Sequence, residues 1–201
     1  VGGGMGMPRF ESAEVGNLEL TWLIPLSLIG TICGWLYFVS EHASEALAHA
    51  IGARPVVKAM LAGLALAICG TVLPYTMFAG ETQADVLMET YLTIPAGVLI
   101  VTGLVKAMLT PALINLGWRG GHFFPVIFSG VSLGYGLAIL TGADPVFCVA
   151  VCTASTMGAV MRQPVMVVGL LLMCFPLKGI VCMIIAAVIA AGIPLPKPLR
   201  K

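Results

Sequence analysis

Long apolar segments, separated by short polar or proline-containing breaks, run along most of the chain. After a glycine-rich and then acidic lead-in over residues 1–19, the first apolar segments cover residues 20–39, 56–77 and 92–116. Each is close to the ~20 residues that an α-helix needs to cross the hydrocarbon core of a bilayer. The pattern predicts membrane-spanning helices, and it places the more polar stretch 40–55 in water or at the interface.

The second half of the chain has shorter apolar segments, separated by proline-containing breaks. These segments cover residues 123–140, 146–161, 165–175 and 179–191. Asp144 is a good N-cap for the second of them, and Arg162-Gln163-Pro164 separates the second from the third. Such interrupted segments are typical of the discontinuous helices that carry binding sites in transporters. We predict an all-α polytopic membrane protein with several tilted and broken transmembrane helices and re-entrant helix N-termini.

Composition supports the bilayer as the solvent for this chain. Of its residues 59% are hydrophobic and 9% are charged, with a mean hydropathy of +1.05. A soluble core of this size would not bury so much apolar surface. The 24 glycines and 13 prolines favour packed, kinked and interrupted membrane helices over straight spans. We predict one transmembrane domain over residues 20–191, followed by a polar tail over residues 192–201.

The charged residues behind the net charge of +1 are distributed unevenly along the chain. Residues 1–89 carry three basic and eight acidic side chains, a net charge of −5. Residues 90–201 carry seven basic side chains and the single acid Asp144, a net charge of +6. A positive part of this kind favours the attraction of anions.

Other chemistry has little support in the sequence. The six cysteines lie in apolar segments without a C-x-x-C pair, so we interpret them as small buried hydrophobic residues rather than metal ligands or disulfides. The chain has no H-E-x-x-H motif and no paired membrane aspartates. We therefore expect no enzymatic activity, no metal, no cofactor and no nucleic-acid partner.

The most informative stretch lies at residues 110–140. An apolar segment ends there in a glycine-rich break, and a second begins around Pro125. Glycine lets the backbone turn sharply, and a proline near the start of a helix needs no amide partner. We predict a helix N-terminus inside the membrane at the GGHFFP turn (residues 120–125). Such a terminus presents unpaired amides and the positive end of a dipole, which together bind anions.

Lys106 lies in the middle of the apolar segment before this turn. An ionisable residue at that depth suggests a functional role. The alternative, which we favour, is that Lys106 snorkels to the interface or faces the protein interior.

The turn and its flanks resemble the CLC family of voltage-gated chloride channels and chloride/proton antiporters. A signature of that family reads glycine, any residue, phenylalanine, any residue, proline, with a second glycine in front. The matching residues here are Gly120, Gly121, His122, Phe123, Phe124 and Pro125.

Further positions support the resemblance. The family's typical lysine and threonine in the preceding helix match Lys106 and Thr110, and its arginine–any residue–proline junction matches Arg162-Gln163-Pro164. The resemblance covers most of residues 20–191 and corresponds to the second half of a CLC subunit. It implies half of the family's inverted-repeat fold.

In that family the anion is held partly by main-chain amides of the residues after the signature glycine. Carried over by position, these are the amides of His122 and Phe123. Gly120 and Gly121 would let the anion approach the backbone, and the two phenylalanines would keep the surroundings dry. Taken without the resemblance, an ordinary glycine turn between two packed membrane helices is the better interpretation of these residues, and the resemblance reverses that preference.

The sequence also departs from the family pattern. The signatures that supply a serine and the gating glutamate belong to the family's first half and are not among these residues, and the late anion-binding tyrosine has no counterpart. His122 occupies the variable position of the signature, where we favour a neutral histidine used in packing over one that titrates near the pore. These departures leave the binding cradle incomplete and proton coupling unsupported.

The leading prediction is transmembrane transport of chloride or a related small anion, with the N-terminal half of the same subunit completing the site. The resemblance further implies a homodimer in the lipid bilayer of the cell inner or plasma membrane. The alternative is a non-transporting structural or regulatory module that assembles with a complete CLC-like partner. The sequence leaves open which anion is bound, and whether transport is passive or proton-coupled.

Overall fold

The computed structural model describes residues 9–77, 80–196 and 199. Parts of the predicted lead-in (1–8), of the polar break after the second span (78–79) and of the tail (197–198 and 200–201) lie outside the described residues. Within the described part, all regular secondary structure is helical. The α-helices are α1 (Asn17–Ile51), α2 (Pro55–Val72), α3 (Glu81–Thr90), α4 (Ala96–Asn115), α5 (Phe123–Thr141), α6 (Pro145–Met161), α7 (Pro164–Leu171) and α8 (Ile180–Gly192).

Two short 3₁₀ helices complete the described elements: η1 (Pro74–Thr76) and η2 (Tyr91–Thr93). Helices α1, α2, α4 and α5 are long and apolar enough to cross a membrane, and α6 and α8 are shorter apolar helices. The predicted all-α, multi-pass architecture is confirmed.

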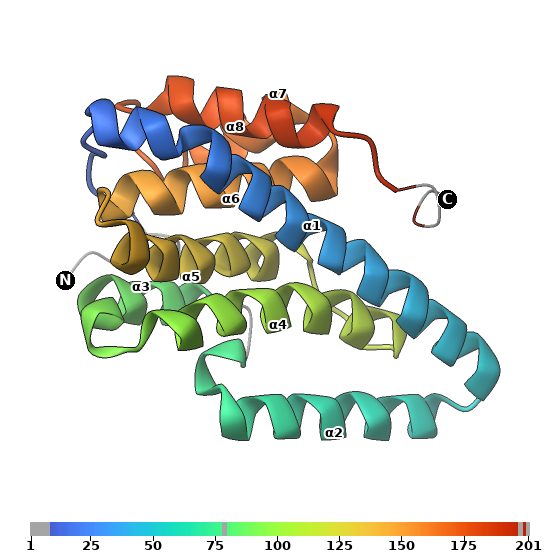
Figure 1. The fold of residues 1–201 in the computed structure, drawn as a ribbon. Coiled ribbons are helices and arrows are strands. Elements are labelled where there is room, and N and C mark those ends of the chain that lie inside the picture. The colour runs from blue at the N-terminus through green and yellow to red at the C-terminus, as the bar shows by residue number, and fades with distance from the viewer. Residues whose placement is uncertain (1–8, 78–79, 197–198, 200–201) are drawn as a thin grey trace.

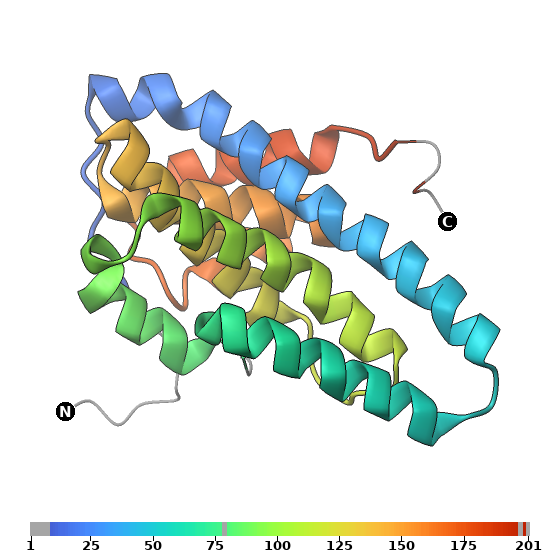
Figure 2. The same ribbon diagram turned by 60° about the horizontal axis from the view of Figure 1, so that its bottom comes forward.

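Helix α5 lies at the centre of the fold, between α4 on one side and α6 on the other (Figure 1). Helix α1 runs diagonally across α6 and α4, and α7 and α8 lie at the opposite side of the molecule from α2. Helix α2 lies at the edge beside α4 (Figure 2). Among the described residues of α2, only Ala62 is buried.

Small residues explain the central position of α5, because they let neighbouring backbones come close. A Cβ added at Gly130 or Gly134 would overlap the backbone of α6 at Thr153 or Val149. On another face of α5, the Ser132 hydroxyl donates to the main-chain carbonyl of Leu99 in α4 at 2.7 Å. Every residue from 126 to 138 is buried. The N-terminus of α5 is therefore held by a fixed scaffold.

Helix α1 is longer than the first predicted span, which was expected to end at about residue 39. A single helix continues through residue 51. The Ser40 hydroxyl donates to the main-chain carbonyl of Met108 in α4 at 2.6 Å, and the Asn115 side-chain amide donates to the Ser44 hydroxyl at 2.9 Å. Polar residues on this part of α1 thus have partners on α4, and the helix does not need to end where the sequence becomes polar.

The polar break after the second span also differs from expectation, because α3 forms there. Ala84 and Leu87 are buried in the core, so one face of this short helix packs against the protein. Residues three apart lie on one side of a helix. In α3 this apolar side is enough to pack the helix against the core, although the segment as a whole has a low average hydrophobicity.

Both predicted junctions around α6 are confirmed. The Asp144 carboxylate accepts a hydrogen bond from the Phe147 amide at 2.7 Å, as an N-cap does. At the other end, Arg162 ends α6 with a φ of 57°. Its guanidinium donates to the main-chain carbonyl of Ala191 at 3.0 Å. Arg162 therefore ties the end of α6 to the end of α8.

Candidate functional site

The GGHFFP turn follows a well-defined end of α4. The Trp118 amide donates to the Leu113 carbonyl and the Gly117 amide to the Ile114 carbonyl, both at 3.0 Å. This is the Schellman pattern, and it requires a left-handed residue after the helix. Gly117 supplies it, with a φ of +100°. The chain is thereby turned sharply away from α4 just before the glycines of the turn.

Helix α5 begins immediately after the turn, as predicted. His122 is the N-cap residue, and its carbonyl accepts the Val126 amide at 3.1 Å. Its side chain makes no capping hydrogen bond, and no hydrogen bond within the described residues uses the amides of His122, Phe123 or Phe124. The first amides of a helix lack partners within it, so here they remain available to a ligand.

The backbone of the turn is accessible. Gly120 and Gly121 are both exposed, and a Cβ added at either would meet no heavy atom of the described residues within 4 Å. Neither glycine has the positive φ that only glycine readily adopts. The fold of this chain therefore does not itself require glycine at these positions. An anion that approaches the neighbouring amides would require glycine there, because a side chain would stand in its way.

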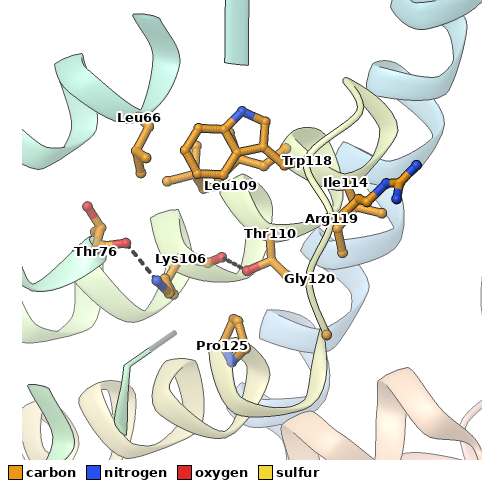
Figure 3. A pocket seen from close by; sticks show the side chains of 12 residues that line it. Leu66, Thr76, Lys106, Leu109, Thr110, Ile114, Trp118, Arg119, Gly120 and Pro125 are labelled. Atoms are coloured by element: carbon orange, nitrogen blue, oxygen red, sulfur yellow. Dashed lines mark hydrogen bonds between the residues drawn. The ribbon is translucent and has the colours of Figure 1, made fainter. Parts of the chain in front are cut away.

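A cavity of about 280 Å³ opens beside the turn (Figure 3). Its walls come from α2, η1, α4, the turn and the start of α5, and they are mainly apolar. The lining residues are Leu66, Thr76, Lys106, Leu109, Thr110, Leu113, Ile114, Trp118, Arg119, Gly120, Gly121 and Pro125. We call this space the α4 cavity.

Lys106 lies in the wall of the α4 cavity and is only 4% exposed. Its ammonium donates to the main-chain carbonyl of Thr76 at 2.7 Å and lies 6.0 Å from the centroid of the Phe128 ring. Of the two positions favoured from the sequence, facing the interior is confirmed and snorkelling is not. The bond to Thr76 also fixes η1 against α4.

The structure divides the six predicted site residues into two groups. Gly120, Gly121 and Pro125 line the α4 cavity. The His122 ring instead stacks on the Phe123 ring, with centroids 4.5 Å apart, and Phe123 and Phe124 are half-buried against the core. The side chains of these three residues thus cover the apolar side of the turn, and their amides belong to the helix N-terminus.

Sequence reasoning missed the contribution of η1 and of Trp118. Thr76 acts through its main-chain carbonyl, and a carbonyl has no sequence signature. Trp118 lies within the glycine-rich break, and it lines the cavity together with Leu66 of α2 and Leu109 of α4 (Figure 3). The sequence feature that could have indicated this cavity wall is the presence of a large aromatic residue beside a glycine-rich turn.

Asn115, the last residue of α4, anchors the start of the turn to α1. Its side-chain amide donates to the Glu41 carbonyl at 3.1 Å in addition to the Ser44 hydroxyl. The turn therefore connects two elements that are held in place, the end of α4 and the buried helix α5.

These features define an integral, multi-pass membrane protein in which an interrupted pair of helices presents a helix N-terminus to a cavity. Ion-transport proteins bind ions at such interruptions. The family model for the voltage-gated chloride channel matches residues 4–194, and the chain belongs to this family.

A solved structure shares the fold. The structure described as a crystal structure of a CLC-type fluoride/proton antiporter is similar with a TM-score of 0.75 and 20% sequence identity. The similarity covers 97% of this chain and 49% of the antiporter chain. This chain thus spans about half the length of that antiporter. None of the curated proteins compared with the chain matches it significantly.

Proposed function

We propose that the chain moves chloride or a related small anion across the membrane, and that main-chain amides of His122 and Phe123 bind the anion. The observation that carries this proposal is the start of α5, where unbonded amides follow two exposed glycines. Unpaired amides and the positive end of the helix dipole both attract an anion, so their effects add.

The surroundings support binding of a small desolvated anion. A hydrogen bond that involves a charged group contributes about 1.5–3 kcal/mol, and the dipole adds about 0.3–1 kcal/mol at an exposed site and more when it is partly buried. Half-buried Phe123 and Phe124 limit water on one side of the turn, and weaker screening strengthens amide–anion contacts. Two amides alone do not enclose an ion, so further donors must come from elsewhere.

We propose that a second segment of comparable length, the N-terminal half of the subunit, supplies those donors. The matched antiporter chain is about twice as long as this chain. We further propose that the assembled subunits pair as a homodimer through faces of α1, α7 and α8. Exposed apolar side chains on α8, among them Val181 and Val188, suit either a protein interface or lipid.

Anion flux from liposomes tests this function. The purified chain would be reconstituted with and without the other half of its subunit, and release of trapped chloride and of trapped fluoride would be measured separately. Saturable release of either anion supports the proposal, and the relative rates identify the preferred anion. If release stays at the level of empty liposomes in both preparations, the alternative of a non-transporting structural or regulatory module replaces it.

Replacing His122 with alanine is expected to change flux only modestly. The substitution removes the imidazole stacked on Phe123 but keeps the main-chain amide. Rates would be compared with wild type in the same liposome assay at equal protein content. A loss of more than tenfold without a change in melting temperature would show that the imidazole itself takes part in transport.

A further inference from the structure

The corner where α1 ends and α2 begins carries polar side chains that the proposed function does not use. Helix α4 ends beside this corner (Figure 2). Glu45 and His49 belong to the last two turns of α1, and Lys58 belongs to the first turn of α2. Together with Ala48 and Asn115 they line a cavity of about 220 Å³. We call this space the corner cavity.

The corner cavity lies between a fixed wall and a peripheral helix. On the α1 and α4 side, the Asn115 side-chain amide donates to the Glu41 carbonyl at 3.1 Å and to the Ser44 hydroxyl at 2.9 Å. On the other side, Ala62 is the only buried residue among those described in α2. Two helices are thus held together at the cavity, and the third is packed against them only lightly.

The side chains of the corner cavity suit a ligand that has both a phosphate and an amine. The Lys58 ammonium is a charged donor for a phosphate oxygen, and the His49 imidazole provides a second donor. Glu45 makes another contact in the structure. Because a carboxylate has about four acceptor positions, Glu45 can accept an ammonium group in addition to that contact.

The surroundings of the corner cavity indicate a membrane lipid as the source of these groups. Val57 and Leu61 flank Lys58 along α2, and both are exposed apolar side chains. Helix α2 is long and apolar enough to cross a membrane, so its first turn lies at the membrane edge. A lysine there reaches the level of the lipid headgroups, and basic pockets between transmembrane helices bind such headgroups.

We propose that the corner cavity binds the headgroup of phosphatidylethanolamine, with the lipid phosphate on Lys58 and His49 and the amine on Glu45. The acyl chains lie along the exposed apolar side of α2, and the bound lipid joins this lightly packed helix to α1. The corner cavity shares no lining residue with the α4 cavity. The inference therefore does not depend on anion transport.

Native mass spectrometry of the purified, delipidated chain in detergent tests this site. Phosphatidylethanolamine, phosphatidylglycerol and phosphatidylcholine would be added in equal amounts, and the bound lipids distinguished by mass. We expect the wild type to bind phosphatidylethanolamine in preference to the other two, because only its headgroup has both a phosphate and an amine that donates hydrogen bonds.

Three substitutions separate the contributions of the two charged side chains. Lys58→Gln should weaken phosphatidylethanolamine binding by about tenfold or more, the effect of losing a hydrogen bond between charged groups. Lys58→Arg keeps the charge and should retain the binding. Glu45→Gln should abolish the preference for phosphatidylethanolamine over phosphatidylglycerol. If Lys58→Gln does not show a melting transition, Lys58→Met provides the same comparison.

Lys178→Gln is the matched control, since it removes the same charge at the other end of the molecule. Lys178 precedes Gly179, where an added Cβ would lie 3.6 Å from the Cβ of Ala13. Ala13 comes just before the start of α1, whereas the corner cavity is at the end of this helix. We expect Lys178→Gln to bind the three lipids as the wild type does.

Three results would overturn the inference. Equal binding of the three lipids by the wild type would show no headgroup site, and equal weakening in Lys58→Gln and Lys178→Gln would show only an effect of net charge. If the other half of the subunit displaces the bound lipid, the corner is an interface between the halves. Each of these results is compatible with anion flux, so each differs from failure of the proposed function.

Discussion

Anion flux is expected to disappear when Gly121 is replaced with leucine, while the fold remains intact. A side chain at this position would stand next to the amides of His122 and Phe123 and would occupy the space through which an anion reaches them. The described residues offer no steric obstacle to it, because a Cβ at Gly121 meets nothing within 4 Å and its φ is not in the left-handed region. The loss of function would therefore come from blocked access and not from misfolding.

Gly97→Leu is the matched control for this experiment. Gly97 is also exposed, and a Cβ there also meets nothing within 4 Å, but it lies in the first turn of α4, at the opposite end of that helix from the GGHFFP turn. We expect Gly97→Leu to keep wild-type flux and Gly121→Leu to lose nearly all of it, because only the second side chain fills the space beside the amides of the turn. Undiminished flux in Gly121→Leu would remove the turn from the transport mechanism.

The second large effect concerns the packing of α5 on α6. Gly134→Ala is expected to lower the free energy of unfolding by about 1–3 kcal/mol, the range typical of overpacking in a filled core. A Cβ at Gly134 would overlap the Val149 backbone and lie 2.9 Å from the Cys148 carbonyl oxygen. Backbone atoms of a buried helix are not free to move aside, so the two helices must separate.

Gly97→Ala is expected to raise the free energy of unfolding. Because that site is open, the substitution brings only the higher helix propensity of alanine, worth up to about 1 kcal/mol. Unfolding of both variants in detergent, followed by circular dichroism against denaturant, measures the difference. Equal stability of the two variants would mean that α5 and α6 do not approach as closely as the structure has them.

Much of the fold follows from local patterns in the sequence. The apolar segments marked the spanning helices, Asp144 marked the start of α6, and the glycines with Pro125 marked the start of α5. The continuation of α1 beyond residue 39 was not predictable, because it depends on hydrogen bonds from Ser40 and Asn115 that exist only once α1 and α4 are packed.

The candidate site was predictable only where it depends on a local sequence pattern. The main-chain portion of the candidate site has a sequence signature, since glycine lets a ligand approach the backbone closely and proline is favoured where a helix starts. Its cavity has none, because the cavity brings together residues of α2, η1 and α4 that are distant along the chain. The depth of Lys106 was evident from hydropathy, but the carbonyl of Thr76 that holds it was not.

Binding of the anion by the amides of the turn is the central claim, and a selectively labelled sample tests it most directly. The chain has three histidines, so ¹⁵N-histidine labelling gives three main-chain amide signals in nuclear magnetic resonance. His42 and His49 lie inside α1, where their amides bond within the helix, and His122 is at the turn. Chloride would be titrated at constant ionic strength.

The claim predicts a saturable shift of the His122 amide signal, with the signals of His42 and His49 unchanged. The shift should be absent in Gly121→Leu and present in the control Gly97→Leu, whose substitution lies far from the turn along α4. A His122 amide that does not respond at chloride concentrations that support flux, or that responds only in parallel with the other two histidines, would contradict binding at the turn.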